Sequence, residues 1–166
     1  MRAGHHDVVV VRARQLRENG VEFLGLPITD EARQWGLAYR SGRLSLPEHQ
    51  CQVHVVHYIH RGPFGARIWE ERDPVTHQPI AIHEAINTYE QKRTIWMDGR
   101  PHPPAWAPHT WQGFSTARFE GDVLVVRTTH LKAGWIRRNG VALSDRAVLT
   151  ERFIRHGDLL THVSIV

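Results

Sequence analysis

The chain has 166 residues, of which 41% are hydrophobic and 23% are charged. This length and composition fit one domain with one hydrophobic core and exclude a largely disordered chain. No apolar stretch approaches the roughly 20 residues of a membrane-spanning helix, and the first residues do not resemble a signal peptide. The single cysteine, Cys51, excludes an intrachain disulfide and a cysteine-only metal cluster. We therefore expect one domain over 1–166, with 1–45 as its less well-defined segment.

The formal net charge is +4, and the chain contains 13 histidines. Arginines are mixed with acidic residues, as in Glu70–Asp73, and form no basic stripe. This pattern argues against a nucleic-acid partner, and nothing indicates a membrane partner. The histidine content instead favours a metal site or an acid–base site, because imidazole serves both roles near neutral pH.

The N-terminal third shows weak organisation. Val8–Arg12 has the composition of a strand, and Thr29-Asp30 is typical of the cap of a short helix near 29–40. The valines of Val53–Ile59 favour another strand.

The remaining chain has a β pattern with clear turn signals. Short loops at Glu120–Asp122 and His156–Asp158 predict two hairpins. The expected strands are Arg67–Glu71, Ile80–Thr88, Arg93–Met97, Ser115–Phe119, Val123–Thr129, Val148–Ile154 and Leu159–Val166. The predicted fold is therefore mainly β, an antiparallel meander that forms a barrel or strongly curved sheet, with one short helix.

Several long motifs lie between about residue 45 and the end of the chain. They are Thr94–Pro103, Ala107–Trp111, Gly113–Asp122, Leu124–Val126, Thr128–Lys132, Trp135–Gly140, Ser144–Arg146 and Thr150–Asp158. In these stretches the chain resembles an uncharacterised group of bacterial proteins. The group has no established activity, so the resemblance implies no function. It implies export, because many members begin with a signal peptide, but Met1–Asp7 is unlike one.

The chain departs from that group at three points. Ala117 stands where its members usually have glycine, and Phe119 where they often have tryptophan. Members also commonly continue beyond the position of Val166 with an acidic, proline-containing segment. The resemblance thus leaves open whether this chain lacks a terminal piece.

A metal site is predicted around the proline-rich segment 101–108. His102 and His109 bracket this segment, and His130 follows the strand Val123–Thr129. Rigid loop ends suit ligand preorganisation, and three histidines with an open fourth position are typical of catalytic zinc. We therefore expect a divalent ion, zinc first, at His102, His109 and His130. The alternative is that these are separate histidines that bond backbone groups or line a pocket.

Other polar residues are weaker candidates. In a strand over Val53–Ile59, His54 and His60 would share one face and His57 the other, which speaks against a three-histidine site. Ser115 resembles a G-x-S-x-G nucleophile with the last glycine lost, but a strand rather than an elbow is expected there.

Glu151 lies inside an otherwise apolar strand. If it points inward it needs an arginine or histidine partner, whereas the alternative is a surface residue on an edge strand. We expect Glu151, with His156 at the following turn, to move protons in catalysis.

Four tryptophans cluster around the proline-rich segment. Indole rings suit an aromatic-lined ligand pocket, although some of them are also expected in the core. The candidate ligand-binding residues are Trp96, Trp106, Trp111 and Trp135.

Three functions follow. The first is a metal-dependent enzyme, a hydrolase acting on a small molecule. The alternative is a non-catalytic, small-molecule-binding β-barrel. The third is an interaction domain in which a missing terminal segment pairs an edge strand, and a homo-oligomer is left open.

Overall fold

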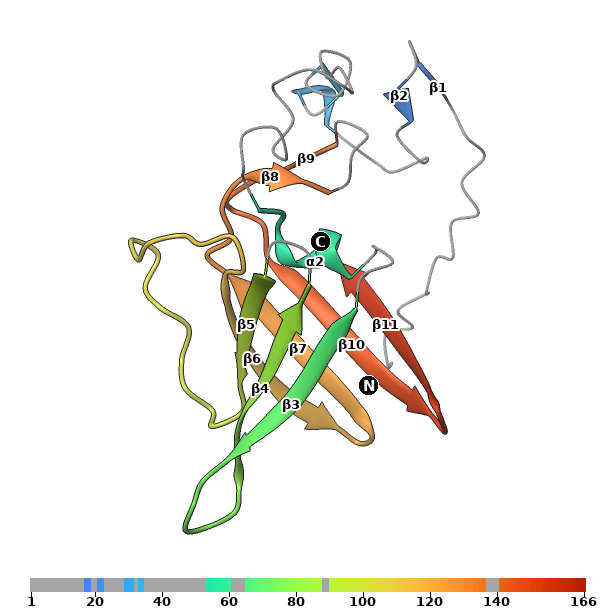
Figure 1. Cartoon of the computed structure of the whole chain (residues 1–166). Helices are drawn as coiled ribbons and strands as arrows, with labels where there is room; N and C mark the ends of the chain where they lie inside the picture. Colours follow the sequence, from blue (N-terminus) through green and yellow to red (C-terminus); the bar gives the residue numbers. More distant parts are fainter. Residues whose placement is uncertain are drawn as a thin grey trace, which may run out of the picture.

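The computed structural model of the chain describes residues 17–18, 21–22, 29–31, 33–34, 53–60, 65–87, 90–136 and 141–166. These residues are mainly β, as predicted. Seven strands form one sheet in the order β11-β10-β7-β6-β5-β4-β3, which curls like a half-barrel (Figure 1). The expectation of one domain over 1–166 extends beyond these residues and stays a prediction.

The strands of the sheet match the expected positions closely. They are β3 (Ala66–Arg72), β4 (Pro79–Ile86), β5 (Gln91–Trp96), β6 (Phe114–Glu120), β7 (Val123–Thr129), β10 (Leu149–His156) and β11 (Leu159–Ile165). Two small pairs lie outside it, β1 (Arg17–Glu18) with β2 (Val21–Glu22), and β8 (Gly134–Trp135) with β9 (Ala142–Leu143). The edge strand β3 is exposed along its whole length.

Both expected hairpins form, β6 with β7 and β10 with β11. Each turn begins with a glycine at positive φ, 60° at Gly121 and 59° at Gly157. A two-residue loop with such a first residue keeps the right-handed twist of both strands. The second turn fixes the register of β11, so that His162 lies opposite Phe153.

One strand pair contradicts the expectation of an entirely antiparallel meander. Strands β5 and β6 are parallel and pair only at Ile95 with Ser115 and at Trp96 with Thr116. A parallel pair needs a crossover connection, which the proline-rich segment and its neighbours over 97–113 supply. Upstream of these two pairs the strands diverge.

The predicted strand over Val53–Ile59 is also wrong. Residues 53–55 have no regular structure, and α2 (Val56–Ile59) is a single helical turn. Val55 and Val56 are both fully buried, which consecutive residues of a one-faced strand would not be. Packing therefore overrides the β preference of valine here.

The short helix expected near 29–40 lies largely outside the described residues. Asp30, Glu31, Arg33 and Gln34 are helical, and the Arg33 N–H donates to the Thr29 carbonyl over 2.9 Å. A helix over the whole range stays a prediction. The strand expected at Val8–Arg12 lies entirely outside the described residues.

The concave face of the sheet carries two apolar clusters. One joins α2 to the strands through Val55, Val56, Ile86, Leu131, Leu143 and Leu149. The other contains Ile95, Val126 and Phe153. Five buried polar residues belong to the same core: Glu84, Arg93, Ser115, Thr128 and Glu151. This polar row positions the candidate site.

Candidate metal centre

Glu151 points into the core. Its side chain is 0% exposed and shares a strand face with the buried Leu149 and Phe153. It has the partners that an inward carboxylate requires, because Arg93 and His162 both bond it. The conditional prediction for an inward Glu151 is therefore confirmed, and the alternative of a surface residue is wrong.

Arg93 is fully paired although it is buried. Its five N–H groups make five contacts with four side chains. Nε donates to Ser115 Oγ (3.1 Å), and Nη2 donates to Thr128 Oγ1 (2.8 Å) and to Glu151 Oε2. Nη1 donates to Glu84 Oε2 and Glu151 Oε1, both over 3.2 Å. A buried guanidinium is tolerated only with such complete pairing.

The charges of this network hold both carboxyl groups ionised. Burial would raise the pKa of Glu151, but the Arg93 charge and the hydrogen bonds from His162 and Arg93 lower it to about 2. Burial likewise opposes the lowering of the Glu84 pKa, which comes from His60 and Arg93. An ionised, buried carboxylate is a strong ligand for a cation.

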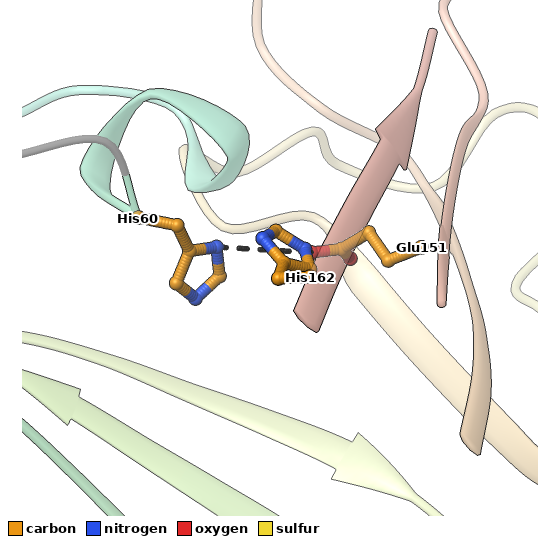
Figure 2. A group of neighbouring side chains, drawn as sticks. All are labelled: His60, Glu151 and His162. Carbon is orange, nitrogen blue, oxygen red and sulfur yellow. Dashed lines mark hydrogen bonds and ion pairs between the residues drawn. The ribbon is translucent and has the colours of Figure 1, made fainter. Parts of the chain in front are cut away.

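Two histidines approach Glu151 from different elements (Figure 2). His162 lies on β11, stacks on the Phe153 ring at 4.5 Å, and donates from Nε2 to Glu151 Oε1 over 3.0 Å. His60 follows α2, and its ring lies 4.6 Å from that of His162.

The two nitrogens of His60 have different surroundings. Nε2 lies 3.3 Å from Glu84 Oε2, close enough to donate to it. Nδ1 is buried, lies 3.8 Å from Glu151 Oε1, and has no hydrogen-bond partner among the described residues. A proton on Nε2 leaves a lone pair on Nδ1, which is the form that binds a metal.

The name metal group is used for three residues, His60, Glu151 and His162. Their ligand atoms lie within 4.8 Å of one another, so the group could hold a metal ion. Two imidazoles and one carboxylate are a donor set that zinc and other transition metals accept, with a position left open. The His60 and His162 side chains are 14% and 21% exposed, so solvent reaches the group. Glu84 contacts the other nitrogen of His60, Nε2. In many metal sites a carboxylate that does not touch the metal orients a histidine ligand in this way.

The three histidines expected to bind metal lie close together, but both nitrogens of His102 and His130 and one nitrogen of His109 contact other groups. His102 contacts the Thr129 and Thr116 hydroxyls over 2.7 and 2.9 Å. His130 contacts Thr129 Oγ1 over 2.8 Å and the Pro104 carbonyl over 3.0 Å, and its ring is 5.1 Å from that of His109. His109 Nδ1 contacts the Leu131 carbonyl over 2.9 Å. Metal binding by these three stays a prediction.

His156 and Glu151 lie apart. His156 is the exposed last residue of β10, five positions along the strand from Glu151, which corresponds to about 17 Å. An odd separation also places the two side chains on opposite faces. A joint catalytic role for them remains a prediction without geometric support.

Two of the four tryptophans line one pocket. Trp96 and Trp111 border a cavity of about 510 Å³ between β5 and the segment 110–114, which leads into β6. The Arg100 guanidinium lies 3.4 Å from the centre of the Trp96 ring, and the Lys132 ammonium 5.1 Å from that of Trp111. Trp106 is 84% exposed, and Trp135 is half-buried in β8.

The sequence analysis missed His60 and His162. A signal for His162 was present, because the two-residue turn at Gly157 fixes it opposite Phe153, on the face of Glu151. No such signal existed for His60, because its position depends on the unexpected helical turn α2.

No family model, curated protein or solved structure matches the chain. Among the described residues, no helix is long and apolar enough to span a membrane. The geometry of the metal group is therefore the main guide to function.

Proposed function

We propose that this protein is a metal-dependent enzyme, a hydrolase acting on a small molecule. A divalent ion, zinc first, would be held by His60 Nδ1, Glu151 Oε1 and His162 Nε2. His162 would bind in the tautomer with its proton on Nδ1, so that the ion replaces the hydrogen bond between Nε2 and Glu151 Oε1. The observation that carries the proposal is the convergence of two imidazoles on a buried, ionised carboxylate, with no residue that the structure describes bonding Nδ1 of His60. This places the ion away from the residues that the sequence favoured.

The charge of the network supports a cation. The single positive charge of Arg93 faces the two negative charges of Glu84 and Glu151, which leaves one negative charge when both histidines are neutral. Buried charge without compensation is costly, so a cation beside Glu151 is stabilised.

Three protein ligands leave one position for water or substrate. A bound divalent ion lowers the pKa of its water toward 7 and polarises a substrate oxygen. In this proposal Glu151 serves as a ligand rather than as the proton carrier that the sequence suggested. The Phe153 ring contacts both imidazoles and gives the group one apolar neighbour.

Metal uptake by untagged protein tests the proposal. We expect one equivalent of zinc in the wild type and in His156→Ala, the matched control, whose histidine is exposed on the same hairpin. His162→Ala and Glu151→Gln should take up none. Folded wild-type protein that takes up no zinc, manganese or iron would overturn the proposal.

Activity is tested with the same preparations. Chromogenic carboxylic and phosphate esters would be hydrolysed by zinc-loaded wild type and not by chelator-treated protein, with recovery on zinc addition. Equal hydrolysis with and without metal would contradict metal-dependent chemistry.

A second candidate function is non-catalytic binding of a small molecule in the pocket between β5 and β6. Its support is the pairing of Trp96 and Trp111 with a buried acceptor, Gln112 Oε1, which has no hydrogen-bond partner among the described residues. Indole faces with polar groups nearby suit a sugar or another polar ring.

Thermal-shift screening with sugars and aromatic acids tests this binding. A ligand at 100 times its Kd adds about 2.7 kcal/mol of stability by mass action. The shift should disappear in Trp96→Ala and persist in Trp106→Ala, whose indole lies on the surface. A panel without any stabilising ligand would count against this function.

A further inference from the structure

We infer that Arg93 is the positioning residue of the metal group, fixing Glu151 directly and His60 through Glu84. The inference rests on the proposed metal binding and adds the residue that shapes the site. Arg93 itself touches neither the ion nor a substrate.

The first step is the contact with Glu151. Nη2 holds Oε2, and Nη1 lies 3.2 Å from Oε1, so the two nitrogens grip the carboxylate as a fork. This grip fixes the plane of the carboxylate and occupies Oε2. Oε1 is then the oxygen that faces His60 and His162. Glu151 is thereby held as a ligand through one oxygen.

The second step is the contact with Glu84. The same Nη1 donates to Glu84 Oε2 over 3.2 Å, and that oxygen lies 3.3 Å from His60 Nε2. Glu84 and Arg93 are also direct partners across β4 and β5. Arg93 thus holds the carboxylate that orients the His60 ring and directs Nδ1 toward Glu151.

The third step is the span of the side chain. Arg93 extends from β5 to Glu151 on β10, past β6 and β7, whose residues beneath it are the short Ser115 and Thr128. Both hydroxyls bond the guanidinium, so its plane is fixed on every side. Lysine offers one nitrogen and cannot reproduce these contacts.

Arg93→Lys tests the inference, with Arg118→Lys as the matched control, because it makes the same substitution in an exposed ion pair with Glu120. The Arg93 variant retains the buried positive charge but loses the fork, whereas the control retains every contact of Arg93. Loss of an outer-shell partner typically lowers metal affinity about 10- to 100-fold, and we expect this loss in Arg93→Lys. The control should bind as the wild type does.

The visible spectrum of the cobalt-loaded protein supplies a readout that a purely structural role would not change. We expect an altered spectrum in Arg93→Lys, because Glu151 is free to turn and bind through both oxygens, and an unchanged spectrum in Arg118→Lys. If the Arg93 variant does not fold, Glu84→Gln replaces it. The glutamine amide can either accept a hydrogen bond from His60 Nε2 or donate one to it. The imidazole proton is then no longer confined to Nε2, so Nδ1 does not always carry a lone pair, and the metal affinity should fall.

The outcomes separate the two proposals. Folded wild-type protein without metal uptake overturns the proposed function, and this inference with it. Wild-type uptake with unchanged affinity and spectrum in the folded variant overturns the role of Arg93 alone.

Discussion

Two groups of histidines in this protein differ in what their nitrogens contact. In the metal group, His60 and His162 approach one buried carboxylate oxygen, and one nitrogen, His60 Nδ1, has no hydrogen-bond partner in the described part of the chain. Around the proline-rich segment, the nitrogens of His102 and His130 contact hydroxyls and a carbonyl. The two groups therefore differ in whether an unbonded histidine nitrogen lies beside an ionised carboxylate among the described residues.

The contacts around the proline-rich segment form a complete chain of donors and acceptors. His130 Nε2 must donate to the Pro104 carbonyl, so in the neutral ring Nδ1 accepts from the Thr129 hydroxyl. Thr129 then accepts from His102 Nδ1, and His102 Nε2 accepts from Thr116. Neutral histidines satisfy every contact in this chain. It attaches the segment to the sheet.

Removing the central carboxylate should have the largest effect. Glu151→Gln leaves Arg93 buried beside a neutral group, and breaking a buried ion pair costs about 3–5 kcal/mol. Urea unfolding measures the loss. The control is Glu120→Gln in the exposed ion pairs with Arg118 and Arg152, which should cost about 0–1 kcal/mol. Similar losses in both variants would contradict the central position of Glu151.

Acid should produce the next largest effect. The pKa of Glu151 falls from an ordinary value of 4.5 to about 2 on folding. The ionised Glu151 contributes fully to the free energy of unfolding above pH 4.5, and this contribution is lost as the pH falls through 2. The pKa shift corresponds to about 3 kcal/mol. Urea unfolding at pH 6 and pH 3 should show about 2 kcal/mol of this loss in the wild type, because pH 3 still lies above the folded pKa, and a smaller loss in Glu151→Gln. An equal loss of unfolding free energy in the two proteins would show that Glu151 is not its cause.

Replacing one histidine from each of the two groups should change the free energy of unfolding less than the loss of Glu151 does. His102→Ala leaves the Thr116 and Thr129 hydroxyls without this partner, which costs about 1–3 kcal/mol, and metal uptake should be retained. His162→Ala should abolish metal uptake. Loss of metal in His102→Ala together with its retention in His162→Ala would restore the site that the sequence favoured.

Mild acid should have the smallest effect, through the proline-rich segment. Burial, then the Arg127 charge and His130, lower the pKa of His102 below 6.5. The folded protein therefore takes up this proton less readily than the unfolded chain, and stability falls as the pH drops below 6.5. Thermal melting between pH 7.5 and 5.5 should show a weaker decline in His102→Gln than in the wild type. An equal decline would exclude His102 as the cause.

The sequence predicted the local features of the fold better than the site. Strand composition and the glycines of two tight turns located the sheet strands, because these signals depend on neighbouring residues. The strand pattern left the direction of Glu151 open, but it did predict that an inward Glu151 needs an arginine or histidine partner. The partner Arg93 could not be identified, since it lies 58 residues away in sequence on another strand.

The errors have a common physical origin. The parallel pairing of β5 and β6 depends on the path of the chain over 97–113, and the turn at α2 depends on packing against Ile86 and Leu149. Neither is visible in local composition. His60 entered the metal group only through that turn, so its role could not be predicted.

The most direct test of the account is a crystal structure of zinc-soaked protein with anomalous scattering at the zinc edge. The account predicts one peak bound by His60 Nδ1, Glu151 Oε1 and His162 Nε2 at about 2.0–2.2 Å. A peak among His102, His109 and His130, or none in protein that remains folded, would contradict it.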